Sequence, residues 1–277
     1  MDWLRTRRTR NGPQRPVDRS DAEPHFRDPP SPRHTRDARR ARERMVRQQI
    51  EARGIHDPEL LRAFRTVPRH VFVDHPDAYE DRALPLPNGQ TISQPYVVAA
   101  MTNAALPRRR GGWQGANVLE IGTGSGYQAA ILSELGANVT SIERHQGLSE
   151  RARQRLQRAG YADVQLKVGD GSRGDPAGAP WDVILVTAAG PSVPQPLLEQ
   201  LEPDGGRLVM PVGTRRHQAI VLVERRGSEL LSRQLEPVAF VPLLGAFGFP
   251  DVYGDEADET DETDDSAAPP SPGESRT

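Results

Sequence analysis

Cysteine is absent from the 277 residues of this chain. Its absence excludes disulfide bonds, thiolate nucleophiles and zinc sites with cysteine ligands. Long hydrophobic runs are absent too, since no apolar stretch approaches the roughly 18 residues that a transmembrane helix needs. The charged N-terminal residues are not followed by the apolar region of a signal peptide. We therefore expect a soluble, cytoplasmic protein.

Hydrophobic residues make up only 35% of the sequence, which is low for a fully globular chain, and the polar composition of the two ends accounts for this low fraction. Residues 1–44 carry thirteen arginines against seven acidic residues, whereas residues 251–277 carry ten acidic residues against one arginine. Neither end has enough apolar surface to offset the entropy lost on ordering. We expect disordered tails at 1–35 and 251–277 around one domain at 36–250. No groove-reading element accompanies the run of arginines at 5–10, so we expect no nucleic-acid partner.

Between the tails, segments with strand and helix periodicity alternate. We expect strands at 118–121, 138–143, 164–168, 181–188, 207–211, 219–225 and 235–242, and helices at 36–51, 57–66, 97–106, 128–135 and 194–201. This alternation predicts one doubly wound α/β sheet, mostly parallel, with helices on both faces. A hairpin-like turn at 226–228 predicts an antiparallel end, and the order of the last strands is left open.

Three glycines at alternate positions, Gly122, Gly124 and Gly126, follow the strand at 118–121 and lead into a helix. A strand, a tight turn and a helix in this order favour a ligand site. Glycine lets the backbone approach a ligand closely, and the free N–H groups of a helix start attract negative or polar atoms. The spacing is not the G-x-G-x-x-G of dinucleotide-binding proteins, so the ligand must be identified from the strands that follow.

Acidic residues end or follow the next two strands. Glu143 lies seventeen positions beyond Gly126, and Asp170 and Gly171 follow the strand at 164–168. Because the carboxyl ends of parallel strands meet at one edge, these residues share that edge with the glycine turn. A carboxylate at the tip of the second strand accepts hydrogen bonds from ribose hydroxyls in nucleoside sites, and Asp170 is placed to meet an adenine amino group. The edge is predicted to bind a nucleoside.

The segment 81–90 is rich in proline and turn formers, which predicts a loop without regular structure. It leads into Thr91-Ile92-Ser93-Gln94-Pro95. On the residues alone, Ser93 is equally well a helix N-cap or a functional residue. We expect no metal site, because His70 and His75 lack a third ligand and any His-Glu-x-x-His pattern.

The glycine turn, the two acidic strand ends and the loop at 91–95 together resemble protein-L-isoaspartate O-methyltransferases of the bacterial type. The resemblance covers about 200 residues, from 45 to 249, and includes Val67-Pro68-Arg69-His70 and Phe240-Val241-Pro242-Leu243. The glycine turn alone would indicate only a methyltransferase that uses S-adenosyl-L-methionine. The loop at 91–95 is what marks this one family.

The resemblance implies a Rossmann-like sheet of the S-adenosylmethionine-dependent methyltransferase type and a monomeric enzyme. Its reaction would methylate the free carboxylate of isoaspartyl (or D-aspartyl) residues in damaged proteins, and the ester would then begin repair through a succinimide. Ser93 would be the catalytic residue that orients this carboxylate, within a substrate-binding loop made of Thr91, Ile92, Ser93, Gln94 and Pro95. The cofactor-binding residues would be Gly122, Thr123, Gly124, Ser125, Gly126, Glu143, Asp170 and Gly171.

Two other readings of the sequence stay open at this point. One is an S-adenosylmethionine enzyme that modifies a different carboxylate, such as that of a dedicated peptide. The other is a nucleoside-binding module without catalytic activity, although the intact Ser93 loop argues against it.

Overall fold

A computed structural model describes residues 32–250, with side chains from residue 37 onward. The expected tails fall mostly on residues 1–31 and 251–277, which lie outside the described residues. Residues 32–35, which we expected to belong to the first tail, are helical instead. No helix in the described part of the chain is both long and apolar enough to cross a membrane.

The fold is built around a seven-stranded sheet with the strand order β5-β4-β3-β6-β7-β8-β9. Pairing is parallel from β5 to β7 and antiparallel between β7, β8 and β9. This confirms the mostly parallel sheet with an antiparallel end, and it supplies the order of the last strands. The strands are β3 Asn117–Ile121, β4 Asn138–Glu143, β5 Gln165–Val168, β6 Val183–Val186, β7 Asp204–Gly213, β8 Gln218–Arg226 and β9 Glu229–Val238.

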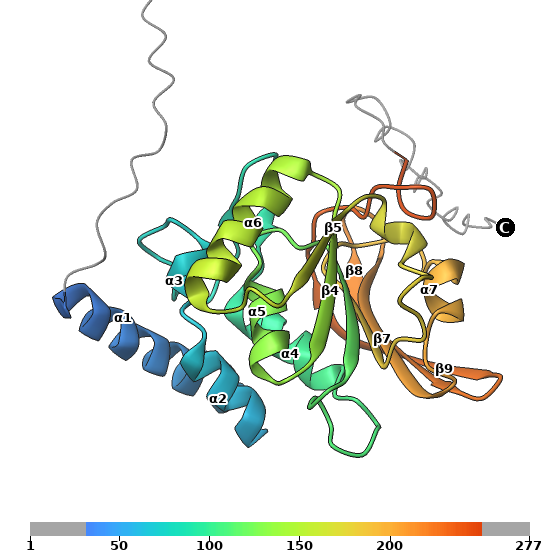
Figure 1. Ribbon diagram of the computed structural model, residues 1–277, viewed down its shortest axis with the longest axis horizontal. Helices are drawn as coiled ribbons and strands as arrows, with labels where there is room; N and C mark the ends of the chain where they lie inside the picture. Colours follow the sequence, from blue (N-terminus) through green and yellow to red (C-terminus); the bar gives the residue numbers. More distant parts are fainter. Residues whose placement is uncertain (1–31, 251–277) are drawn as a thin grey trace, which may run out of the picture.

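Helices cover both faces of this sheet, as the alternation of elements predicts (Figure 1). Side chains of β3 alternate between two hydrophobic clusters, with Val118 in the larger cluster and Leu119 in the smaller one. The larger cluster contains side chains of α2 Pro58–Thr66, α4 Pro95–Ala104, α5 Tyr127–Glu134 and α6 Gln146–Ala159. The smaller cluster lies under α7 Gln195–Glu199. The core is therefore divided into two layers by the sheet.

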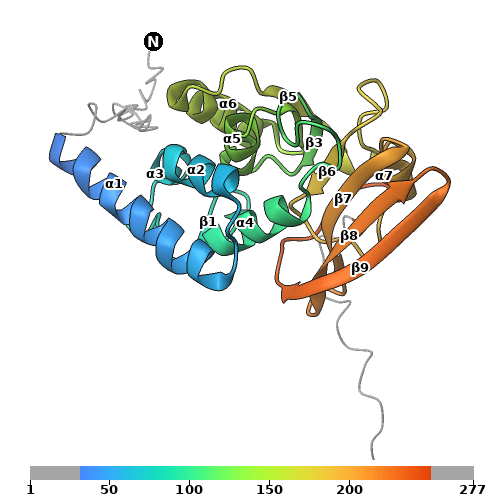
Figure 2. The same ribbon diagram turned by 90° about the horizontal axis from the view of Figure 1, so that it is seen from below.

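The N-terminal helices belong to this larger layer and form its outer part, on the side away from α7 (Figure 2). Helix α1 Pro32–Met45 continues through the π-turn η1 Val46–Ile50 and the 3-10 turn η2 Glu51–Arg53, and it ends at Gly54 in the left-handed conformation. Asp57 caps α2, since its carboxylate accepts a hydrogen bond from the N–H of Leu60 at 2.8 Å. Both of these helix boundaries follow from the sequence.

Two local expectations need correction, and three elements are additions to those expected from the sequence. Residues 81–90 are not wholly irregular, because β1 Leu84–Pro85 pairs antiparallel with β2 Thr91–Ile92. The segment 69–72 forms the short helix α3 Arg69–Phe72. Helix α6 and the 3-10 turn η3 Gly171–Arg173 were not assigned from the sequence. Strand β9 begins at Glu229, six residues before the expected start, because it pairs along most of β8 and needs no buried face of its own.

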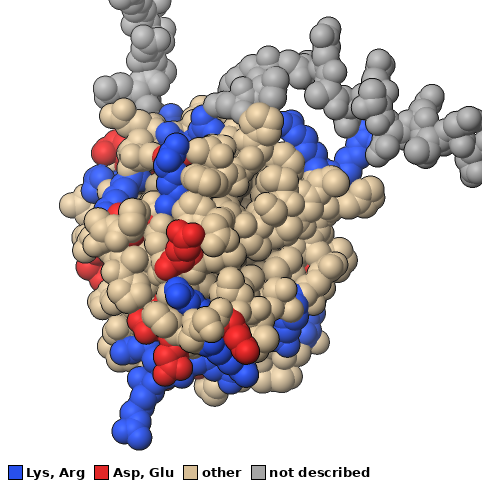
Figure 3. Space-filling view, turned by 90° about the vertical axis from the view of Figure 1, so that its right-hand side faces the viewer, with Lys and Arg blue, Asp and Glu red and all other residues tan. Residues whose placement is uncertain are grey.

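Figure 3 shows the molecule from the side that carries the antiparallel strands and α7. Acidic and basic residues are interspersed on this face, and uncharged residues cover much of its middle. No large area of a single charge sign is visible on it.

Candidate active site

Two pockets meet at the carboxyl edge of the parallel strands. The first, which we name the Glu143 pocket, lies at the ends of β3 and β4 and is lined by Gln90, Thr91, Ile121, Gly122, Gly124, Ile142, Glu143, Arg144, His145, Gly171, Thr187, Ala188, Val241, Pro242, Leu243 and Leu244. The second, the Ser93 pocket, is lined by Thr91, Ile92, Ser93, Val98, Met101, Gly122, Thr123, Gly124, Ser125, Tyr127, Gln128, Thr187 and Phe240. The pockets share Thr91, Gly122, Gly124 and Thr187, so a molecule in one lies beside a molecule in the other.

The glycines of the turn are required for different reasons. Gly122 has φ +95°, and a Cβ there would collide with Thr187 Oγ1. Gly124 has φ +53° and lines both pockets at the point where they meet; a Cβ there would make only ordinary contacts, the nearest 3.8 Å from Leu86, so its left-handed backbone is what favours glycine. Gly126 has φ +88°, and a Cβ there would lie only 3.2 Å from a carbon of Leu156 in α6, so this glycine serves helix packing and lines neither pocket. The side chains of Thr123 and Ser125 are buried, and each takes part in a hydrogen bond within the protein.

Glu143 is held rigidly at the end of β4. One carboxylate oxygen accepts a hydrogen bond from the N–H of Gly124 at 2.9 Å, and the other accepts one from the N–H of His145 at 3.0 Å. The side chain is 5% exposed, yet it lines the pocket. Each carboxylate oxygen has a second lone pair, so Glu143 can accept two further hydrogen bonds from a ligand diol.

Asp170 and Gly171 are neighbours in sequence, but their surroundings differ and only Gly171 borders the Glu143 pocket. Gly171 lines the Glu143 pocket, and a Cβ on it would collide with Ile121. Asp170 does not line the pocket. Its carboxylate accepts hydrogen bonds from the N–H and hydroxyl of Ser172 and from the N–H of Ala246 at 2.9 Å. Burial acts to raise the pKa of Asp170, but these hydrogen bonds lower it below its ordinary value.

Another wall of the Glu143 pocket comes from the C-terminal end of the family resemblance, which the resemblance places near the cofactor. This segment supplies Val241, Pro242, Leu243 and Leu244. The N–H of Leu243 donates to Ala189 at 2.7 Å, so this segment is tied to the residues after β6. An apolar slot beside a fixed carboxylate and a glycine turn fits an adenosine, with a base between apolar walls and a ribose against the carboxylate. The residues present therefore fit S-adenosylmethionine.

The Ser93 loop enters the second pocket from the opposite side. Thr91, Ile92 and Ser93 line this pocket, whereas Gln94 and Pro95 belong to the start of α4. Gln94 occupies the N-cap position of α4, and no side chain caps the helix. None of the hydrogen bonds of the described residues involves the hydroxyl of Ser93. This geometry contradicts the N-cap reading of Ser93 and leaves its hydroxyl available to a ligand.

A second carboxyl group, Glu120 of β3, lies fully buried beneath the pockets. It accepts a hydrogen bond from the hydroxyl of Ser141, which also lies 2.6 Å from Thr123 Oγ1. Its other carboxyl oxygen has no partner among the described residues. Burial raises the pKa of Glu120 to about 8, a shift that the Ser141 hydrogen bond reduces and the nearby charge of Glu143 increases. Glu120 is therefore a protonated acid at neutral pH.

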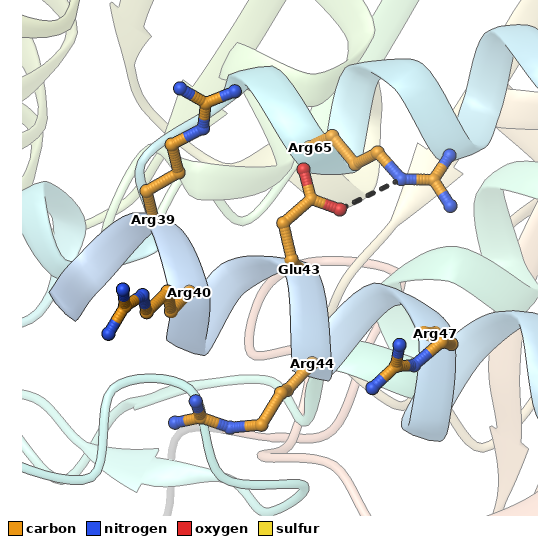
Figure 4. Close-up of a pocket in the computed structure, with 6 residues that line it drawn as sticks. All are labelled: Arg39, Arg40, Glu43, Arg44, Arg47 and Arg65. Carbon is orange, nitrogen blue, oxygen red and sulfur yellow. Dashed lines mark ion pairs between the residues drawn. The ribbon is translucent and has the colours of Figure 1, made fainter. Parts of the chain in front are cut away.

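A separate open groove lies between α1 and α2 and is lined mainly by arginines. Figure 4 shows Arg65 facing Glu43 across it, with the other guanidinium groups spread along α1 and the adjoining turn η1. The Nε of Arg65 lies 3.3 Å from a carboxylate oxygen of Glu43. Its lining residues are Arg39, Arg40, Glu43, Arg44, Arg47 and Arg65, and none of them lines either pocket at the strand edge. His70 and His75 do not join the site either, since their ring nitrogens interact with Tyr79 and Asp77.

A glycine turn, a carboxylate on the second strand and an adjoining acceptor pocket define the class of S-adenosylmethionine-dependent methyltransferases. Comparison with known proteins identifies the family. The model of the protein-L-isoaspartate(D-aspartate) O-methyltransferase family matches residues 40–247, and the chain belongs to this family. It is an S-adenosylmethionine-dependent protein carboxyl methyltransferase, and its substrates are proteins that contain isoaspartyl residues.

Relatives and solved structures agree with this assignment. The chain is 52% identical to protein-L-isoaspartate O-methyltransferase from Methanoculleus marisnigri over 214 residues, which cover 76% of this chain and 94% of that one. It is 50% identical to protein-L-isoaspartate O-methyltransferase 1 from Syntrophobacter fumaroxidans, with 76% and 97% covered. A solved protein-L-isoaspartate O-methyltransferase has 29% identity and a TM-score of 0.66 over 75% of this chain and 67% of that chain. A Plasmodium falciparum structure in complex with S-adenosyl-L-homocysteine, at 19% identity and TM-score 0.63, covers 75% of this chain and 98% of that chain and has the same fold.

The raised pKa of Glu120 predicts a specific pH dependence of stability. Unfolded Glu120 loses its proton near the ordinary value of 4.5, whereas the folded protein keeps the proton up to about pH 8. The folded state thus binds more protons between these values, so Glu120 makes the free energy of unfolding fall as pH rises, by roughly 1 kcal/mol per pH unit. Glu120→Gln should flatten this slope when thermal unfolding is followed from pH 5 to pH 8.

Other groups do not obscure this comparison. The pKa values of Asp170 and Glu224 are lowered, so both carboxylates titrate below the window. Burial lowers the pKa of His70, which makes stability rise with pH, but this contribution is common to both proteins and cancels in their difference. Glu150→Gln on the surface of α6 is the matched control, and it should keep the wild-type slope. Parallel curves for wild type and Glu120→Gln would show that Glu120 is ionised in the folded protein.

Proposed function

We propose that the Glu143 pocket holds S-adenosylmethionine and that Ser93 orients the isoaspartyl carboxylate in the adjoining pocket. In this assignment Glu143 accepts hydrogen bonds from the two ribose hydroxyls. The turn from Gly122 to Gly126 contacts the amino-acid part of the cofactor through its backbone, with the Thr123 and Ser125 side chains locking the turn. Gly171 lies against the adenine. Asp170 either holds the neighbouring Ala246 in place through its hydrogen bond or accepts a hydrogen bond from the adenine amino group.

The chemistry needs positioning more than it needs acid or base catalysis. The substrate α-carboxylate has an ordinary pKa of about 3.5 and is already ionised at neutral pH, so no general base is required. When bound, S-adenosylmethionine supplies a methyl group on a sulfonium, which a carboxylate oxygen can attack. The protein must therefore hold one carboxylate oxygen toward the shared wall of the two pockets and keep water away from it.

The free hydroxyl of Ser93 is the observation that carries this proposal. A hydroxyl without a hydrogen-bond partner among the described residues, on the wall of a pocket that adjoins the cofactor site, is suited to donate a hydrogen bond to a ligand oxygen. Among the described residues, no hydrogen bond joins Ser93 to a His or acidic residue, and this supports an orienting role over a covalent one. Thr91 and Ile92 line the Ser93 pocket, and Gln94 and Pro95 fix the point at which the loop enters α4.

Glu143→Ala should weaken binding of S-adenosylhomocysteine by roughly 2 to 4 kcal/mol, because it removes two hydrogen bonds to a charged acceptor and frees the N–H of Gly124. Calorimetric titration measures this directly. Glu150→Ala removes an exposed carboxylate on α6 and should bind normally. A folded Glu143→Ala protein with wild-type affinity would show that this carboxylate does not hold the ribose.

Ser93→Ala should slow methyl transfer to an isoaspartyl peptide by roughly thirty- to a thousandfold, since a positioned donor is worth about 2 to 4 kcal/mol in the transition state. Affinity for S-adenosylhomocysteine should be unchanged, because the hydroxyl lies in the other pocket. Ser93→Thr keeps a donor and should recover part of the rate. A fully active Ser93→Ala enzyme would contradict the orienting role.

We also propose that residues 36–250 act as one monomeric catalytic domain in the cytoplasm, without a nucleic-acid partner. Among the described residues, all those that line the two pockets fall between positions 90 and 244, which supports an activity independent of the ends of the chain. Removing residues 1–31 and 251–277 should leave the melting temperature, the monomeric mass by light scattering and peptide methylation nearly unchanged. A large loss of activity in a protein that still melts normally would assign a role to one of these ends.

A further inference from the structure

Arg69 is a fully buried cation near the proposed catalytic loop. It is the first residue of α3, and its relative exposure is 0%. Burial lowers the pKa of the Arg69 guanidinium to about 10, which leaves it charged at neutral pH. None of the ion pairs formed by the described residues includes it. A buried charge without a carboxylate partner is costly, so its position calls for an explanation.

The guanidinium group instead contacts neutral groups on three segments of the chain. Its Nε donates a hydrogen bond to the carbonyl of Ala78 and one Nη donates to the carbonyl of Ser93, both at 2.8 Å. The group also lies over the ring of Tyr127, with 4.9 Å to the ring centroid. Tyr127 is the first residue of α5, directly after the glycine turn. Arg69 thus joins the Ser93 loop to the helix that begins at the cofactor pocket.

The contact with Ser93 is made to the residue that carries the proposed catalytic hydroxyl. Arg69 itself lines neither pocket, so it does not reach the substrate. On its N-terminal side the loop is held by the pairing of Ile92 with Leu84, and beyond Ser93 the carboxylate of Asp81 accepts a hydrogen bond from the N–H of Tyr96 at 3.3 Å. The hydrogen bond to the Ser93 carbonyl fixes the peptide plane between Ser93 and Gln94, and with it the position of the Ser93 Cα that carries the hydroxyl side chain.

We infer that Arg69 is a positioning residue for methyl transfer, acting through the backbone carbonyl of Ser93. This inference rests on the orienting role proposed for Ser93. A planar guanidinium can hold the two carbonyls and lie flat over Tyr127 at the same time, whereas an ammonium or an amide can satisfy only part of this geometry. Arg69 sets where the Ser93 hydroxyl lies in its pocket, and a small displacement of a positioned donor costs a large factor in rate.

Arg69→Lys and Arg69→Gln test this inference. Both should lower kcat for an isoaspartyl peptide by roughly ten- to a hundredfold, with a smaller effect on KM, while the dissociation constant of S-adenosylhomocysteine stays within about twofold of wild type. Arg65→Gln is the matched control, since it removes an arginine of α2 that pairs with Glu43 and Glu51 and touches neither pocket. It should leave kcat unchanged. Loss of S-adenosylhomocysteine binding in both Arg69 variants would assign Arg69 to the fold and overturn the inference.

A double-mutant cycle separates this role from a general structural one. If Arg69 acts through Ser93, adding Arg69→Lys to Ser93→Ala should slow the enzyme by no more than about threefold beyond Ser93→Ala alone. Losses that multiply in the double mutant would overturn the role of Arg69 and leave that of Ser93 intact. A fully active Ser93→Ala enzyme would instead remove the proposed function on which the inference rests.

Discussion

The hydrogen bonds from Thr187 Oγ1 to the carbonyl oxygens of Ile121 and Gly122, at 3.1 and 2.6 Å, fix the separation of β3 and β6 at the sheet edge. Thr187 lines both pockets, and Gly122 must lack a side chain because Thr187 occupies the space. This single close approach creates the wall that the pockets share. The cofactor and the substrate carboxylate must react where the two pockets adjoin. The rest of the structure supports this position.

The support on the acceptor side comes from elements far apart in the sequence. Helix α4 is held at its start by Asp81 and at its end by Arg207, which donates hydrogen bonds to the carbonyls of Ala104 and Leu106. Arg207 is in turn paired with Glu224 at 2.9 Å. Asp81 pairs with Arg53 of η2 at 3.1 Å. The helix that follows the Ser93 loop is thus tied to the N-terminal helices at one end and to the antiparallel strands at the other. Rigidity at both ends is what a reaction governed by positioning requires.

The parts of the site that lie within one strand and its turn could be predicted from the sequence. Glycines with positive φ, the carboxylate at the tip of β4 and the capped start of α2 depend on local backbone geometry, which a sequence records directly. The pairing of β1 with β2 and the early start of β9 depend on a neighbouring strand. The composition of a short segment does not show whether such a strand lies beside it. The apolar wall at Leu243 and Leu244, the internal bonds of Asp170 and the burial of Arg69 depend on long-range packing. These features therefore required the structure.

The central claim is that the Ser93 pocket selects a carboxylate carried on the isoaspartyl backbone and orients it toward the shared wall. Methyl transfer to two peptides that differ only in aspartate or isoaspartate at one position tests it most directly. The extra methylene of isoaspartate moves the free carboxylate relative to the flanking chain, so a rigid pocket should distinguish the two. The account predicts rapid methylation of the isoaspartyl peptide and almost none of its aspartyl twin. Equal rates on both peptides would contradict it.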